Sequence, residues 1–169
     1  MTTIVAIISS MAIVYNKLGE RQITLYIETQ KISEMIFRAK ALALATYNQN
    51  PPPLNPSCGY GLEINYQSGQ YDVFSYEPPV SQGCAISQIN TAYRTVLGAV
   101  EMLHTDLAFD NVPPDALYAV LFVPPEPRVL MSSQSSGNLG TTPLKIYLVT
   151  KNGSLSTVIS VNLAGQINF

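Results

Sequence analysis

The first 47 residues contain no proline, and this feature constrains the fold more than any other. The first strong helix breaker is the run Pro51-Pro52-Pro53, and only Gly19 weakens the stretch before it. A helix over residues 1–47 would be about 70 Å long at the usual rise per residue. That length is too great for a helix packed entirely inside a chain of 169 residues. Part of it must therefore project from the domain or lie in another environment.

The two parts of this predicted helix differ in their apolar pattern. Residues 1–16 carry no charge, because the first charged residue is Lys17; we expect this part to lie in a membrane or in a filament core. Residues 17–47 are amphipathic. Their predicted packing face consists of Leu18, Leu25, Ile32, Met35, Ile36, Ala39, Leu42 and Ala43. Their predicted polar face carries Gln22, Thr29, Ser33 and Lys40.

The apolar start does not have the pattern of a cleaved signal peptide. It has neither a basic region before the apolar run nor a clear cleavage site between small residues. It is also shorter than the roughly 20 apolar residues that a membrane-spanning helix needs. We therefore expect an interfacial segment, or the later part of a longer apolar helix that begins before Met1.

Composition favours an extracytoplasmic domain rich in β-strands. The chain has nine basic and eleven acidic residues, so its charge does not favour nucleic acid as a partner.

The expected head covers residues 58–169 and follows a proline-rich linker at 48–57. Cys58 and Cys84 lie in the head; we expect a disulfide, with a reduced buried pair as the alternative. A disulfide would place the head outside the cytoplasm.

Several segments of the head are predicted strands. Residues 62–66 and 70–76 should form a hairpin whose inward side chains are Leu62, Ile64, Tyr71 and Val73. Residues 116–123 are apolar throughout, which predicts a central strand buried on both faces. Short strands are expected at 85–89 and 129–131, with loops at 110–115 and 132–142. The segment 93–103 favours a strand, although its end at 99–103 could be helical.

The last part of the head predicts a second hairpin. Its strands are residues 144–151 and 154–161, joined by a two-residue turn at Asn152-Gly153, the preferred sequence for such a turn. Residues 166–169 should add one more short strand. The polar loop at 132–142 is not followed by a helix, so we do not expect it to bind phosphate.

No grouping of residues predicts catalysis, a cofactor or a metal site. His104 is the single histidine and is expected at the surface beside Asp106. Glu63 and Asp72 are expected on the solvated face of the first hairpin. We expect four tyrosines near that hairpin to pack in the core or on the sheet face, and an adhesive surface is the alternative: Tyr60, Tyr66, Tyr71 and Tyr76.

The order of these motifs resembles that of the type IV pilin superfamily. Residues 1–15 are similar to the later part of the pilin hydrophobic helix. Residues 59–65 and 69–74 resemble the first hairpin of minor pseudopilins of the H/fimbrial T type (GspH/FimT), and residues 120–127 and 158–167 resemble later segments of that group. The family's opening Phe-Thr-Leu-x-Glu sequence does not occur here, so we expect the mature start to precede Met1.

This resemblance implies an α+β fold, with a long N-terminal helix packed on a mainly antiparallel sheet. It also implies a structural subunit of a type IV pilus-like or type II secretion-like filament. The expected location is the inner membrane with an extracytoplasmic head, or an extracellular filament. Expected partners are other pilin or pseudopilin subunits, the inner membrane and the pilus assembly machinery. The residues expected to pack the helix during assembly are Ile4, Val5, Ile7, Ile8, Met11, Val14, Leu18, Leu25 and Ile32.

Two other classes of function remain as alternatives. One is a membrane-anchored or pilus-tip binding module for DNA or a surface ligand. The residues 162–169 carry no basic side chain, which disfavours DNA. The other is a secreted enzyme, which the missing catalytic grouping disfavours.

Overall fold

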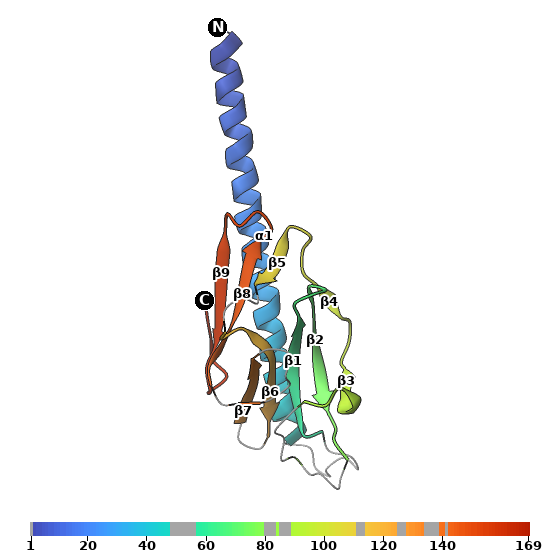
Figure 1. Ribbon diagram of the computed structural model, residues 1–169. Coiled ribbons are helices and arrows are strands. Elements are labelled where there is room, and N and C mark those ends of the chain that lie inside the picture. Colours follow the sequence, from blue (N-terminus) through green and yellow to red (C-terminus); the bar gives the residue numbers. More distant parts are fainter. Residues whose placement is uncertain are drawn as a thin grey trace.

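A computed structural model shows one long helix standing beside two antiparallel sheets (Figure 1). It describes residues 2–47, 57–79, 84, 89–110, 114–124, 128–133, 139–140 and 142–169, with helix side chains from Lys17 to Thr46. Helix α1 (Thr2–Tyr47) is 46 residues long, and its N-terminal part projects beyond the sheets. Within the described part of the chain, no helix has an apolar stretch long enough to cross a membrane.

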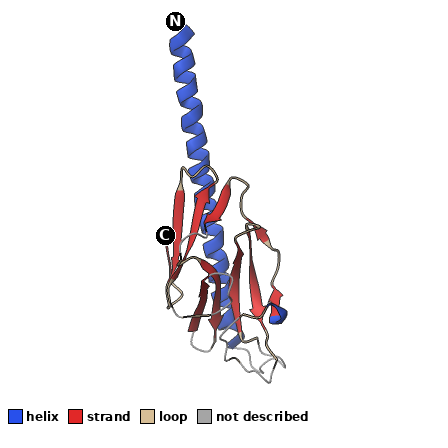
Figure 2. Ribbon diagram, viewed as in Figure 1, coloured by secondary structure: helices blue, strands red, loops and turns tan. Residues whose placement is uncertain are grey.

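The first sheet has the strand order β3-β2-β1-β6-β7, and β4 also pairs with β2. Its strands are β1 (Gly59–Asn65), β2 (Gln70–Tyr76), β3 (Arg94–Val96), β4 (Glu101–Met102), β6 (Leu117–Val123) and β7 (Arg128–Ser133). A short 3₁₀ turn, η1 (Thr91–Tyr93), precedes β3. The second sheet has the order β10-β9-β8-β5. Its strands are β5 (Leu107–Asp110), β8 (Leu144–Thr150), β9 (Ser156–Val161) and β10 (Ile167–Asn168). Figure 2 shows both sheets lying along the C-terminal part of the helix.

The core lies between α1 and the inner faces of both sheets. Ile32, Ile36 and Ala39 are fully buried there. They pack with β-sheet residues such as Leu62 and Ile146 in one continuous cluster. An apolar helix face covering apolar sheet faces removes the surface of all three elements from water. The predicted α+β fold, a long N-terminal helix on antiparallel sheet, is confirmed.

The polar face predicted for α1 is partly wrong. Thr29 and Ser33 are both only 3% exposed. They follow Leu25 at successive spacings of four, which places them on the buried face of the helix. Each hydroxyl donates to the carbonyl four residues earlier: Thr29 to Leu25 at 2.7 Å and Ser33 to Thr29 at 2.8 Å. Their polar groups are therefore satisfied inside the helix, and burial leaves no hydroxyl unpaired.

Leu18 departs from the prediction in the opposite direction. It was expected on the packing face, but it is 41% exposed. Helix α1 extends beyond the sheets toward its N-terminus (Figure 1). The helical period is correct, but at Leu18 the sheets do not cover the packing face.

The first hairpin matches its prediction. Strands β1 and β2 pair with Leu62 opposite Val73 and Ile64 opposite Tyr71, and these four side chains are buried. Gly61 pairs with Phe74. A Cβ on Gly61 would stand only 2.7 Å from Cζ of the Phe74 ring, which is too close. A side chain at position 61 would therefore displace the ring. The central strand prediction is also confirmed, because consecutive residues Val120, Leu121 and Phe122 of β6 are fully buried.

The second hairpin exists, but its turn is longer than predicted. The ladder between β8 and β9 reaches Val149 and Ser156, and the Thr150 amide donates to the Leu155 carbonyl at 2.9 Å. Residues 151–154 therefore form the loop in place of a two-residue turn, and β9 begins later than predicted. The Asn152 side chain explains the difference, because its Oδ1 accepts hydrogen bonds from the Ser154 amide and hydroxyl. β10 confirms the predicted last strand.

The middle of the head differs most from the sequence prediction. The segment 93–103 forms β3 and β4, with Gly98 at a φ of 91° between them. The helical alternative for 99–103 is wrong, because Glu101 and Met102 pair with β2. β5 was not predicted. The linker at 48–57, the strand at 85–89 and the loop at 132–142 fall mostly outside the described residues.

Candidate functional site

The side of α1 away from the sheets exposes large apolar residues. Phe37 is 52% exposed, and Ile23 and Tyr26 are more exposed still. We define the outer stripe as Ile23, Tyr26, Ile27, Phe37 and Leu44. Single exposed apolar residues are ordinary, but several along one helix side mark an interaction surface. The outer stripe is therefore the candidate functional site.

Sequence reasoning missed this stripe. It assigned one apolar face to residues 17–47 and read the remainder as polar. The signal was present, because Phe37 and Leu44 are seven apart and Ile23 and Tyr26 three apart, spacings that return to one helix side. The helix has apolar residues on two sides, and only one of them is covered by the sheets.

The predicted helix-packing residues are divided by the structure. Leu25 and Ile32 are buried in the core between α1 and the sheets. Leu18 is exposed. The others lie in α1, but their side chains are outside the described ones: Ile4, Val5, Ile7, Ile8, Met11 and Val14. Their role in assembly stays a prediction.

A buried carboxylate helps to fix the rotation of α1. Glu28 is 3% exposed and accepts a hydrogen bond from the Tyr71 hydroxyl of β2 at 3.2 Å. Its other oxygen pairs with Lys31 Nζ at 2.7 Å. Burial, and then the negative charge of Glu28, raise the pKa of Tyr71 above its usual range. Because the carboxylate must face β2, the outer stripe must face away from the sheets.

A second polar contact joins the C-terminal part of α1 to the second sheet. Lys40 Nζ donates to the carbonyl oxygens of Ala164 and Gly165 at 3.0 and 3.2 Å. These carbonyls belong to the turn between β9 and β10, where Gly165 has a φ of 65°. Lys40 was predicted on a free polar face, whereas it binds the C-terminal turn to the helix.

Grooves flank the outer stripe on both sides. One groove of about 560 Å³ lies between α1 and β9 and is lined by Leu25, Tyr26, Thr29, Leu155, Thr157 and Phe169, among other uncharged residues. The other, about 350 Å³, lies between α1 and the connection of β3 to β4. It is lined by Lys31, Glu34, Met35, Arg38, Ala99 and Glu101. The groove beside β9 is therefore lined by uncharged side chains, whereas charged side chains line the groove on the other side of the stripe.

Glu63 and Asp72 do not form a solvated face, so that prediction is wrong. They lie opposite each other on β1 and β2, and Arg94 of β3 binds both. The distance from Arg94 Nη1 to Glu63 Oε2 is 2.9 Å, and Nη2 pairs with Asp72 Oδ1. The guanidinium also lies 5.1 Å from the centre of the Phe74 ring. Arg94 therefore joins β3 to the first hairpin.

The electrostatics of this cluster follow from its burial. Desolvation raises the pKa of Glu63, while the positive charge of Arg94 opposes that shift. Because the guanidinium is held by both carboxylates and the ring, this is a structural ion pair network. It presents no free nucleophile or base.

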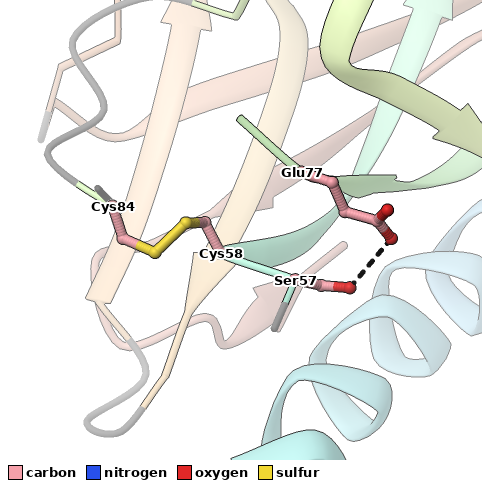
Figure 3. Close-up of a disulfide and its surroundings, with 4 residues drawn as sticks. All are labelled: Ser57, Cys58, Glu77 and Cys84. Carbon is pink, nitrogen blue, oxygen red and sulfur yellow. Dashed lines mark hydrogen bonds between the residues drawn. A yellow bond between two sulfur atoms is a disulfide. The ribbon is translucent and has the colours of Figure 1, made fainter. Parts of the chain in front are cut away.

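The predicted disulfide between Cys58 and Cys84 is present, with the Cα atoms 5.3 Å apart. It joins the start of β1 to the chain beyond β2. Next to it, the Ser57 hydroxyl donates to Glu77 Oε1 at 3.1 Å (Figure 3). Cys58 belongs to a second apolar cluster on the outer face of the first sheet, with Phe74, Tyr76, Leu121 and Leu130. The disulfide thus attaches Cys84 to this second core.

The tyrosines of the first hairpin pack as expected. Tyr71 and Tyr76 are buried. Tyr66 stacks on Tyr118 at 4.4 Å between ring centres, and its hydroxyl donates to the Leu117 carbonyl at 2.8 Å. The Tyr60 hydroxyl accepts a hydrogen bond from Thr46 of α1 at 2.9 Å. Tyr60 and Tyr71 therefore join the sheet to α1, whereas Tyr76 packs in the second apolar cluster.

His104 lies at the surface, as predicted. Its Nδ1 is 3.9 Å from Asp106 Oδ2, and both side chains are largely exposed. Among the described residues, no three histidine, cysteine or acidic side chains gather to hold a metal ion.

Comparison with known proteins gives one structural likeness. No protein-family model matches the chain, and no curated protein matches it. The structure is similar to the minor pseudopilin EpsH from the type 2 secretion system of Vibrio cholerae. The two are 14% identical, the match covers 85% of this chain and 94% of that chain, and the TM-score is 0.46.

Proposed function

We propose that this chain is a structural subunit, a minor pilin or pseudopilin, of a type IV pilus-like or type II secretion-like filament. The observation that supports this most is the outer stripe on a helix that extends beyond its head. A helix with one side in the core and a second apolar side exposed is suited to bind other helices. The proposed role requires no reaction and no cofactor.

The energetics favour repeated contacts over a single pair. Full burial of a large apolar side chain contributes about 1.5–3 kcal/mol. The stripe residues are already about half buried, so about half of that stabilisation remains to be gained when a partner covers them. Covering the outer stripe would then yield roughly 5 kcal/mol. Association itself costs about 4–15 kcal/mol. One such contact is therefore weak, and stable assembly needs several neighbours and the apolar residues 1–16.

The disulfide supports the proposed location. Disulfides persist in oxidising compartments, so Cys58–Cys84 fits a head outside the cytoplasm. In this proposal residues 1–16 of α1 lie in the inner membrane before assembly and in the filament core afterwards. Both environments remove the same apolar side chains from water, so the transfer can be close to balanced. The partners are other pilin or pseudopilin subunits and the machinery that assembles them.

The test places a charge on the outer stripe. Ile23→Asp and Phe37→Asp should prevent filament incorporation, because a carboxylate would be buried between helices without a partner. Leu163→Asp is the matched control: it is an exposed apolar residue, 47% exposed, that lies outside α1. Circular dichroism should show all three heads folded. Normal filament incorporation of both stripe variants would contradict the proposal.

A further inference from the structure

Two different sheet edges lie on opposite sides of α1 (Figure 1). On one side, the uncharged groove between α1 and β9 is bounded by Tyr26, Thr157 and Phe169; we call it the β9 groove. On the other side, β3, β4 and the connection between them expose Val96, Val100 and Met102, which are 39%, 48% and 62% exposed. We call these three residues the β3–β4 edge.

We propose that the β9 groove of one copy of this chain receives the β3–β4 edge of the next copy. The inference rests on the proposed function and adds to it the contact between heads. It concerns residues outside the helix stripe, apart from Tyr26, which belongs to both surfaces. The contact is head to tail, since two different surfaces of the same chain meet.

The chemistry of the two surfaces is complementary. No charged side chain lines the β9 groove among the described residues. A charged peptide or a nucleic acid would therefore find no charged side chain there to pair with, and desolvating its charges would be unfavourable. Val96, Val100 and Met102 carry no charge and are exposed enough to enter a neighbour's groove. Glu101, which stands between the last two, lines the charged groove beside α1. Methionine adapts well to grooves of irregular shape.

The positions of the two surfaces favour a second copy as the occupant. They flank the outer stripe on its two sides, so copies related by rotation about an axis parallel to α1 would bring the β9 side of one against the β3–β4 side of the next. A contact between two different surfaces repeats from copy to copy and builds a ring or a filament. A symmetric pair would instead place β9 against β9 and leave both β3–β4 edges uncovered.

The backbone edges add to this argument. β10 pairs only with Ser160 and Val161 of β9. Along the rest of that side of β9, residues 156–159 have no neighbouring strand in the described structure. β3 is likewise the outermost strand of its sheet. Both open edges are short, which suits a reversible contact and limits uncontrolled aggregation.

Cysteine cross-linking tests the contact. Ser156→Cys places a thiol at the β9 groove, and Met102→Cys places one on the β3–β4 edge; both positions are exposed. The two single variants of the full chain are co-expressed in filament-forming cells and then oxidised. We expect a covalent dimer only in the mixture, and no dimer from either variant alone. Leu163→Cys mixed with Met102→Cys is the control and should give none.

Three results would overturn the inference. Dimers of Ser156→Cys alone would show a symmetric contact between β9 strands. Equal cross-linking in the Leu163→Cys control would show that the contact is not specific. Normal filaments of the mixed variants without a cross-link would refute this head contact while leaving the proposed function intact. If the unmodified chain enters no filament or membrane assembly, both the head contact and the proposed function are wrong.

Discussion

Breaking the disulfide should cost the head a measurable part of its stability. Cys58 and Cys84 are 26 residues apart in the sequence. In the chain-entropy model, a closed loop of that length stabilises the folded state by about 3.5 kcal/mol at 25 °C. Cys58 is also buried among the apolar residues on the outer face of the first sheet. Loss of the disulfide should therefore also loosen the packing of this second apolar cluster around Cys58.

Urea unfolding of the intact protein and of the Cys58→Ser/Cys84→Ser variant measures this loss. With a dependence of about 1–3 kcal/mol per molar urea, a loss of about 3.5 kcal/mol corresponds to a midpoint lower by roughly 1–3.5 M. Ser57→Ala is the control, because it keeps the disulfide and removes only the neighbouring hydrogen bonds of the Ser57 hydroxyl, to Glu77 and from Tyr60. A loss below about 1 kcal/mol with an unchanged slope would refute the reasoning, since it would mean that the loop constraint does not stabilise the head.

Further predictions concern the core, two tyrosines of the first hairpin region and the ion cluster. Ile32→Ala should destabilise the fold by about 2–5 kcal/mol in denaturant unfolding, because Ile32 is fully buried between helix and sheet. Burial raises the pKa of Tyr66 and Tyr71 above the usual value of 10.0, so the folded state keeps protons that the unfolded state loses. Stability should therefore fall as the pH rises above about 10, and a tyrosinate absorbance step should coincide with the loss of circular dichroism; tyrosines that all ionise before unfolding would contradict this. Arg94→Met should lower the free energy of unfolding by about 3–5 kcal/mol, because Asp72 would remain buried without its partner. Adding Asp72→Asn should restore part of that loss, and no recovery would argue against the ion pair.

The fold could be predicted from the sequence where local signals and burial agree. The strand β6 is apolar at consecutive positions, and both of its faces are buried. The first hairpin alternates, and its alternate residues face α1. The helix could be predicted from the absence of breakers up to Pro51.

Other features depend on tertiary contacts that no local pattern contains. Glu63 and Asp72 look like a solvated pair until β3 brings Arg94 between them from a distant part of the chain. Thr29 and Ser33 look polar, but their hydroxyls are satisfied by the helix backbone. The loop at 151–154 is longer than the sequence suggests because the Asn152 side chain accepts a hydrogen bond from the Ser154 backbone amide.

The candidate site illustrates the same limit. A helical pattern shows which residues share a side, but it does not show how many sides the rest of the chain will cover. Leu25 and Phe37 are both apolar residues of α1, yet one is buried and the other exposed. Only the placement of the two sheets shows which apolar side is left for a partner.

The most direct measurement of the central claim is photo-cross-linking from the outer stripe in the native host. A photoreactive phenylalanine analogue replaces Phe37, and the products are identified by mass spectrometry after filament assembly. The proposed function predicts cross-links from position 37 to the helices of neighbouring pilin or pseudopilin subunits. The same analogue at position 163, outside the stripe, should give no cross-link to a helix. Cross-links from position 37 to a soluble ligand alone, or none in assembled filaments, would contradict the claim that the outer stripe of α1 joins subunits.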